Sequence, residues 1–321
     1  MSSVLGLLWL FLLLTVAAWL VAALVSARLS RRVLAINLAP QERARRSFVL
    51  ASLPGLASVV MAGGVAALAL GTSRGWVEDH CEGHGPGHPH LCFEHLPAID
   101  LGAAEALAVT ALLVALVVMI ARFLWREGLA TAQMNTVLRL VQGRGPCSRV
   151  DDDGVFAIAT GVLSPRVLLS RGLLENVGPR ERRIVLAHEV AHLRRGDLAK
   201  NWLFEVLLLL HFPPTARRLR AEWRQALEEC ADDTVAQRFG REAVAATLVK
   251  VARCQQASRL PGLAASGADT LRRIERLLHP AEEGRTMPVV SLCLAGVFAV
   301  SMLLMGSHHF LETLLGLVTG H

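Results

Sequence analysis

The sequence predicts a mainly α-helical, polytopic membrane protein with four transmembrane helices and a cytoplasmic α+β domain inserted between helices 3 and 4. Hydrophobic residues make up 53% of the 321 residues, and the mean hydropathy of +0.44 is too high for an ordinary soluble protein. The apolar residues are concentrated in four blocks, and many of the arginines lie beside these blocks. Most ionisable groups fall in one long segment between the third and the fourth block.

Each apolar block is long enough to cross a bilayer as a helix, which takes about 20 residues. The blocks are Val4 to Ala27, Phe48 to Leu70, Leu101 to Ile120 and Met287 to Met305. The first block has no basic segment before it and is followed by arginines. We therefore expect a retained anchor there and not a cleaved signal peptide.

The distribution of arginines predicts the orientation. Six arginines lie between the first two blocks, whereas the segment between the second and the third carries only Arg74. The positive-inside rule then places the N-terminus outside the cell and the long polar segment in the cytoplasm. The predicted parts are transmembrane helices at 1–27, 48–71, 101–121 and 287–306, a basic cytoplasmic loop at 28–47, an extracytoplasmic loop at 72–100, a cytoplasmic domain at 122–286 and a short outer tail at 307–321.

The net charge of +6 and the pI of about 9.5 are compatible with nucleic-acid binding. However, the arginines lie mostly at membrane edges and on predicted helices, and no nucleic-acid-binding module is recognisable. We expect no direct contact with nucleic acid.

The hexapeptide AHEVAH places His188 and His192 four residues apart, with Glu189 directly after the first. On a helix the two imidazoles lie one turn apart on one face, where they can bind a single zinc ion, with Glu189 beside a water molecule. Pro179 before the motif and Gly196 after it are typical of the two ends of a helix. The alternative is an amphipathic helix with ordinary surface or core histidines.

A zinc hydrolase needs a third protein ligand. A second predicted helix, Glu222 to Gly240, carries Glu228 as the candidate ligand and Asp232 one turn later, where it can orient an imidazole. Glu229 is a reserve candidate, and Cys230 lies nearby without being needed as a ligand. The alternative here is a solvated acidic face.

Other parts of the cytoplasmic segment have recognisable patterns. Thr160 to Ser170 predicts a short hairpin, whose edge strand could align an extended peptide. Trp202 to Phe212 is apolar but too short to span a bilayer, so it is a re-entrant or interfacial helix, or core. Helices are expected at Glu242 to Ala257 and at Thr270 to Leu278, and Asp151 to Asp153 is expected to form a turn.

The chain resembles the BlaR/MecR type of integral-membrane zinc peptidase, the signal-transducing proteases of antibiotic-sensor systems. The resemblance is carried by Ser164 to Arg166, Arg183 to Asp197, Glu228 to Asp233 and Arg272 to Leu278. The four-span layout, with the zinc domain between spans three and four, also fits this family.

The resemblance implies that His188, His192 and Glu228 bind zinc and that Glu189 is catalytic. It implies a zinc-dependent metalloendopeptidase in the bacterial inner membrane, whose substrate is a protein or peptide such as a cytoplasmic transcriptional repressor. The resemblance ends after Met305, because Gly306 to His321 is too short for a penicillin-binding sensor domain. We therefore do not extend it to antibiotic sensing.

In the expected mechanism, zinc polarises the scissile carbonyl while Glu189 takes a proton and later delivers it to the leaving amine. The chain contains no tyrosine that could stabilise the oxyanion. The candidates for that role are His211, an arginine or a backbone amide.

The predicted outer loop contains two cysteines and five histidines. A disulfide between Cys81 and Cys92 is the simplest interpretation on an oxidising side of the membrane. The histidines are candidate ligands of a second metal ion, because clustered histidines bind zinc or copper. The histidines are His80, His84, His88, His90 and His95, and His308 and His309 of the tail are expected on the same side.

Two other functions remain open. One is a membrane-protein quality-control metalloprotease of the HtpX or Ste24 type, although those relatives place further spanning helices between the histidines and the glutamate. The other is a non-catalytic, metal-sensing membrane receptor, which the intact Glu189 disfavours because a structural zinc site needs no general base.

Overall fold

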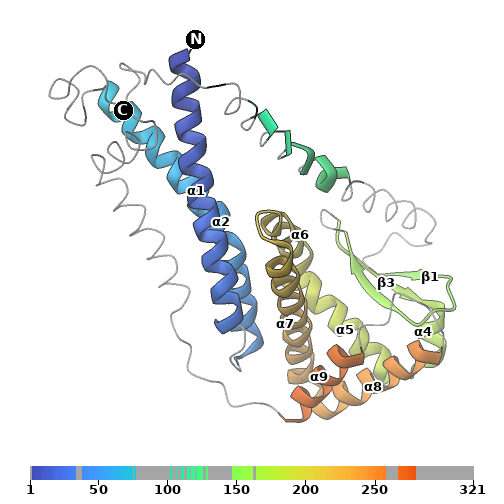
Figure 1. The fold of residues 1–321 in the computed structure, drawn as a ribbon. Helices are drawn as coiled ribbons and strands as arrows, with labels where there is room; N and C mark the ends of the chain where they lie inside the picture. Colours follow the sequence, from blue (N-terminus) through green and yellow to red (C-terminus); the bar gives the residue numbers. More distant parts are fainter. Residues whose placement is uncertain are drawn as a thin grey trace.

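The computed structural model describes residues 2–33, 38–74, 76, 147–161, 164–257 and 267–279, together with isolated residues between 102 and 128. The described part consists mainly of helices, with one small sheet beside them (Figure 1). The prediction of a mainly helical protein is therefore confirmed. Most of the outer loop, the fourth span, the tail and about half of the third span lie outside the described residues, although residues described at 121–125 are helical.

Two long helices, α1 (Ser2–Val33) and α2 (Pro40–Ser73), lie side by side along most of their length (Figure 1). They contain the segments Phe11–Arg32 and Pro40–Ala67, which are long and apolar enough to cross a membrane. Ser26 of α1 donates a hydrogen bond to the Leu50 carbonyl of α2 at 2.9 Å. The first two predicted spans are thus present as helices of suitable length and composition.

Helix α2 begins earlier than the apolar pattern predicts. Arg43 and Arg46, which the sequence assigns to a cytoplasmic loop, lie in the first turns of α2 and are only 3% and 2% exposed. Arg46 donates to Glu42 one turn earlier at 2.8 Å, and Arg43 pairs with Glu229 of a distant helix. Ion pairing therefore lets these charged residues extend the helix into the protein interior.

Three short strands form the sheet: β1 (Cys147–Val150), β2 (Ala157–Thr160) and β3 (Arg166–Ser170). Their order is β1-β3-β2, with β1 parallel and β2 antiparallel to β3. The predicted hairpin is present as β2 and β3, and β2 forms one edge of the described sheet. The expected acidic turn is also present, since Asp152 accepts a hydrogen bond from the Gly154 amide at 2.6 Å.

Helix α4 (Arg171–Asn176) leads from the sheet to α5 (Pro179–Arg195), which carries the HExxH motif. Pro179 stands in the first turn of α5, and Gly196 ends the helix with φ at +66°, a conformation that favours glycine. The same glycine begins α6 (Asp197–Leu208). The two helices are therefore joined with almost no loop.

Helices α6 and α7 (Pro213–Phe239) form a helical hairpin, whose connecting turn lies at Leu209–Phe212. Helix α7 is nine residues longer at its start than the sequence pattern predicts. The turn packs against both long helices: Trp19 Nε1 donates to the Leu210 carbonyl at 2.9 Å, and Gly55 approaches the Leu210 side chain closely.

The apolar segment at 202–212 is neither wholly core nor wholly surface, since Phe204 is buried and Trp202 is 43% exposed.

Helices α8 (Arg241–Ala257) and α9 (Gly267–Leu278) complete the described part. One core joins α2 to α6 and α7, through residues such as Leu50, Phe204 and Trp223. A second core joins α5 to α7, α8 and α9, and includes Ile184 and Leu277. Helix α7 belongs to both cores, so it connects the apolar helices to the HExxH helix.

Candidate functional site

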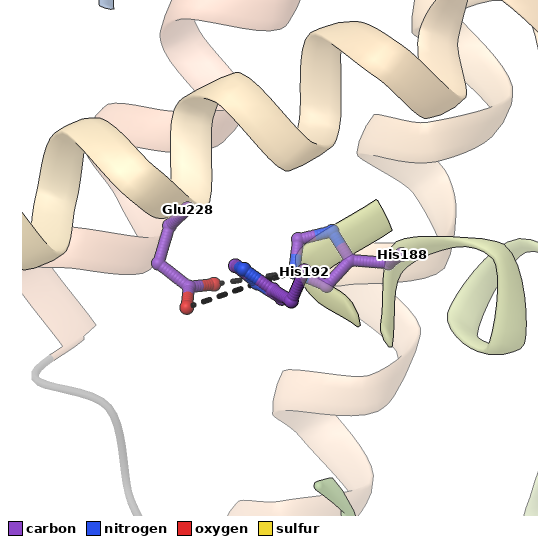
Figure 2. A group of neighbouring side chains, drawn as sticks. All are labelled: His188, His192 and Glu228. Carbon is purple, nitrogen blue, oxygen red and sulfur yellow. Dashed lines mark hydrogen bonds and ion pairs between the residues drawn. The ribbon is translucent and has the colours of Figure 1, made fainter. Parts of the chain in front are cut away.

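His188 and His192 of α5 and Glu228 of α7 converge on one point between the two helices (Figure 2). The two Nε2 atoms lie 3.2 Å apart. Glu228 places Oε2 3.3 Å from His188 Nε2 and Oε1 3.5 Å from His192 Nε2. The structure therefore brings together the three residues that the sequence proposes as metal ligands.

The spacing of these atoms suits a zinc ion. Ligands about 2.0–2.1 Å from a tetrahedral centre lie about 3.3 Å from one another, close to the three distances observed here. Two imidazole nitrogens and a carboxylate oxygen are also a donor set that catalytic zinc sites use, with a fourth position left open. The three residues thus fit a single metal ion.

Each imidazole is held from behind by a buried aspartate. Asp232 Oδ1 lies 3.1 Å from Nδ1 of His188, and Asp197 Oδ2 lies 2.9 Å from Nδ1 of His192. Contacts at Nδ1 leave both Nε2 atoms directed at the candidate metal position. Sequence reasoning assigned Asp232 such a role but missed Asp197, although an aspartate directly after the Gly196 cap was a usable signal.

Arg273 of α9 lies in a segment that carries the family resemblance, but sequence reasoning assigned it no role in the site. Its Nε and Nη2 each lie 2.8 Å from an oxygen of Asp232, and its Nη1 lies 2.8 Å from Glu228 Oε2. One guanidinium therefore fixes a candidate ligand and the aspartate behind another ligand. No local pattern could reveal this, because α9 is remote from α5 and α7 in the sequence.

The charged side chains around the candidate metal position shift the pKa values of His188 and Glu228. Burial alone would lower the pKa of His188, but hydrogen bonds to Asp232 and Glu228 raise it to about 10. Burial would raise the pKa of Glu228, yet His188 and Arg273 hold it well below its ordinary value. In the absence of metal, the pair is thus an imidazolium facing a carboxylate, and a bound cation would replace that proton.

Glu189 lies beside the metal-binding group and faces strand β2. Its Oε2 accepts a hydrogen bond from the Ala159 amide at 2.7 Å. Burial raises the pKa of the Glu189 carboxyl, although the nearby imidazoles act in the opposite direction. A raised pKa is what a group needs to take up and return a proton near neutral pH.

A cleft of about 870 Å³ surrounds these residues. Its lining includes His188, Glu189, His192, Glu228 and Arg273 as well as residues 156–159 of the sheet edge. Because residues alternate along a strand, Ala157 and Ala159 direct their backbone groups to the same side, which is the side of Glu189. The cleft therefore contains the edge strand β2, whose Ala159 amide is bound to Glu189, next to the metal-binding group.

Two other predicted site residues lie elsewhere. His211 is in the α6–α7 turn, where its Nε2 contacts the Ala51 carbonyl of α2 at 3.0 Å, and it does not line the cleft. The structure therefore gives His211 no contact with the cleft in which an oxyanion would form, because packing of the turn places it against α2. Glu229, the reserve ligand, is 1% exposed and faces Arg43 of α2.

The cysteine predictions are tested only in part. Among the described residues, Cys147, Cys230 and Cys254 form no disulfide, and Cys230 is buried. Cys81 and Cys92 lie outside the described residues, as do His80, His84, His88, His90 and His95. The disulfide and the outer metal site therefore stay predictions.

Residues 154–277 match the family described as BlaR1 peptidase M56. The matched segment contains the HExxH helix, Glu228, Asp232 and Arg273, as well as strand β2. No curated protein and no solved structure matches the chain. The family match agrees with the resemblance seen in the sequence, and it covers the part of the structure that forms the cleft.

Proposed function

We propose that this chain, whose residues 154–277 match the BlaR1 peptidase M56 family, is a zinc-dependent endopeptidase of the bacterial inner membrane that cleaves a cytoplasmic regulator. The observation that carries the proposal is the convergence of His188, His192 and Glu228, with Glu189 between them and the edge strand β2. A structural metal site would not require a partly buried carboxylate in that place.

In this proposal the two imidazoles and Glu228 hold one zinc ion. The ion would supply the Lewis acidity with which zinc peptidases polarise a carbonyl and activate water. Asp232, Asp197 and Arg273 act as positioning residues, because they hold the imidazoles and Glu228 in place. Glu189 takes the proton from the attacking water and passes it to the leaving amine.

Strand β2 would bind the substrate. An extended peptide can add to the edge formed by Ala157 and Ala159 through backbone hydrogen bonds, which align the chain without demanding one particular sequence. The peptide would take over the Ala159 amide, which donates to Glu189 in the structure, so that a peptide bond would lie next to that carboxylate.

The contacts of the α6–α7 turn support a site at the membrane surface. Trp19 and Ala51, to which the turn binds, belong to the two segments suited to crossing a membrane. We propose that these segments span the bilayer with the cleft on the cytoplasmic side, so that a regulator reaches the cleft from the cytoplasm.

The test uses the full-length protein in detergent and its Glu189→Gln variant. We expect about one zinc per chain in both proteins, and cleavage of a random peptide library by the unchanged protein only. A zinc-loaded Glu189→Gln protein that still cleaves would contradict the assignment. Proteins trapped by this variant in cells then identify the substrate: a soluble repressor supports signalling, whereas damaged membrane proteins support quality control.

A further inference from the structure

The cleft has two chemically different parts. One part is apolar and is lined by side chains of α4, α5 and α8: Leu173, Ile184, Val185, Leu248 and Val251. The other part is basic and is lined by three arginines of α7: Arg217, Arg220 and Arg224. A substrate that fills the whole cleft therefore meets apolar side chains in one part and positive charge in the other.

The arginines lie on the same face of α7 as Glu228. Arg217, Arg224 and Glu228 are spaced by seven and by four residues, which correspond to two turns and one turn of a helix. The opposite face of α7, with Leu219 and Trp223, is buried in the core shared with α2. The basic side chains therefore project into the cleft and not into the core of the fold.

The basic part carries more positive charge than its neighbours neutralise. Arg220 forms a two-pronged ion pair with Glu205 of α6 at 2.6–2.9 Å, and Arg224 lies 3.3 Å from the same carboxylate. Arg224 is 62% exposed. Within the described part of the chain, no carboxylate pairs with the exposed Arg217. Glu205 thus contacts Arg220 and Arg224 but not Arg217, so the guanidinium groups of Arg217 and of the largely exposed Arg224 remain available to a ligand in the cleft, which Asp269 also lines.

The distances suit a peptide that extends away from the metal-binding group. With a rise of about 1.5 Å per residue, Arg224 and Arg217 stand about 6 Å and about 16 Å along α7 from Glu228. An extended peptide covers about 3.3 Å per residue, so these lengths correspond to about two and about five residues. A carboxylate side chain at such a distance from the scissile bond would lie within reach of an arginine.

We propose that Arg217 and Arg224 select substrates with acidic side chains about two to five residues from the cleaved bond, on one side of it. This inference rests on the proposed function, because it concerns the same cleft. Anionic lipid headgroups are the other ligand that arginines near a membrane bind. The position of the arginines inside the cleft, on the face of Glu228, favours a polypeptide.

The experiment measures peptide preference with and without cleavage. A random peptide library is incubated with the zinc-loaded full-length protein, and the cut sites are read by mass spectrometry. Binding of the same library is measured with the Glu189→Gln protein. We expect Asp and Glu to be enriched on one side of the cut sites and among the bound peptides.

Charge-reversing and neutral variants test whether Arg217 and Arg224 cause the preference for acidic peptides. In the double variant Arg217→Glu/Arg224→Glu, the preference for acidic over amide-containing peptides should fall by about tenfold. In Arg217→Gln/Arg224→Gln the same preference should fall by less. The Gln pair guards against misfolding caused by charge reversal. Arg218→Glu is the matched control, because Arg218 is exposed on the same helix but does not line the cleft. Its acidic preference should be unchanged.

Three results would overturn the proposal. They are no acidic enrichment in the unchanged protein, an enrichment that persists in both double variants, and an equal loss in Arg218→Glu. A double variant that loses only its response to phosphatidylglycerol in nanodiscs would assign the arginines to lipid headgroups and overturn it as well. Acidic peptides that bind to the Glu189→Gln protein while the zinc-loaded unchanged protein cuts nothing would instead refute the peptidase function alone.

Discussion

Arg43 of α2 and Glu229 of α7 form a buried ion pair, although 186 residues separate them in the sequence. Glu229 also lies 3.5 Å from Arg272 and 3.4 Å from Arg276, both on α9. One carboxylate therefore joins an apolar helix suited to crossing the membrane to the two helices that carry Glu228 and Arg273. A shift of α2 would act directly on the residue next to the candidate ligand.

The first prediction concerns this ion pair. Glu229→Ala leaves Arg43 buried without its carboxylate, and breaking such a pair costs about 3–5 kcal/mol. For a chain of this size we expect the Tm in detergent to fall by about 10 °C. Glu222→Ala is the control, because Glu222 lies 3.6 Å from Arg43 but is 23% exposed, and its Tm should change by less than about 3 °C. Equal Tm values for the two variants would contradict the conclusion that Glu229 is the stabilising partner of Arg43.

A second prediction separates the two adjacent glutamates. Glu228→Gln removes a candidate metal ligand, so its zinc affinity should fall by about a hundredfold or more. Glu229→Gln keeps a side chain of nearly the same shape away from the metal position, so it should retain about one zinc per chain. Metal content after dialysis against a weak chelator distinguishes them. Retention of zinc by Glu228→Gln and its loss from Glu229→Gln would reverse the assignment.

Arg273 provides the third prediction. Arg273→Met removes the cation that holds both Glu228 and Asp232, so the two carboxylates should lose their alignment with the imidazoles. We expect zinc affinity to fall by about ten- to a hundredfold, as measured by competition with a chromophoric chelator. In the control Arg272→Met, the changed residue is half-exposed and pairs with Glu222 and Glu229, so the affinity should change by less than about twofold. A normal affinity in Arg273→Met would exclude the positioning role.

The fourth prediction concerns pH. The neighbouring carboxylates raise the pKa of His188 to about 10 in the metal-free protein, so zinc must displace a proton at neutral pH. Each unit by which the pH falls below that pKa should therefore weaken apparent zinc binding by about tenfold. Asp232→Asn removes one cause of the raised pKa and should make the dependence shallower. Zinc affinity that does not change between about pH 6 and about pH 8 would contradict this interpretation.

Local sequence patterns predicted the elements that depend on local chemistry. The spacing of the HExxH motif, Pro179 and Gly196 indicated α5, and the segment Thr160 to Ser170 indicated the hairpin. Glu228 could be proposed because helical periodicity places it one turn from Asp232. These features require only neighbouring residues.

Features that depend on tertiary contacts could not be predicted in this way. The early start of α2 depends on the ion pair between Arg43 and Glu229. The position of His211 away from the cleft depends on its hydrogen bond to the Ala51 carbonyl. The role of Arg273 depends on α9 packing against α7. In each case, a charged or polar side chain is placed by a partner far away in the sequence, and a single sequence does not reveal that partner.

The core shared by α2, α6 and α7 limits how the protein can be handled in the laboratory. Leu50 and Leu53 of α2 cover Phe204, Leu219 and Trp223 of the helical hairpin, and all five side chains are at most 3% exposed. A shortened fragment without the first two helices would expose these side chains to water and should aggregate. Removing α2 would also strip Arg43 from Glu229, so detergent or nanodiscs with the intact chain are the appropriate material for every assay.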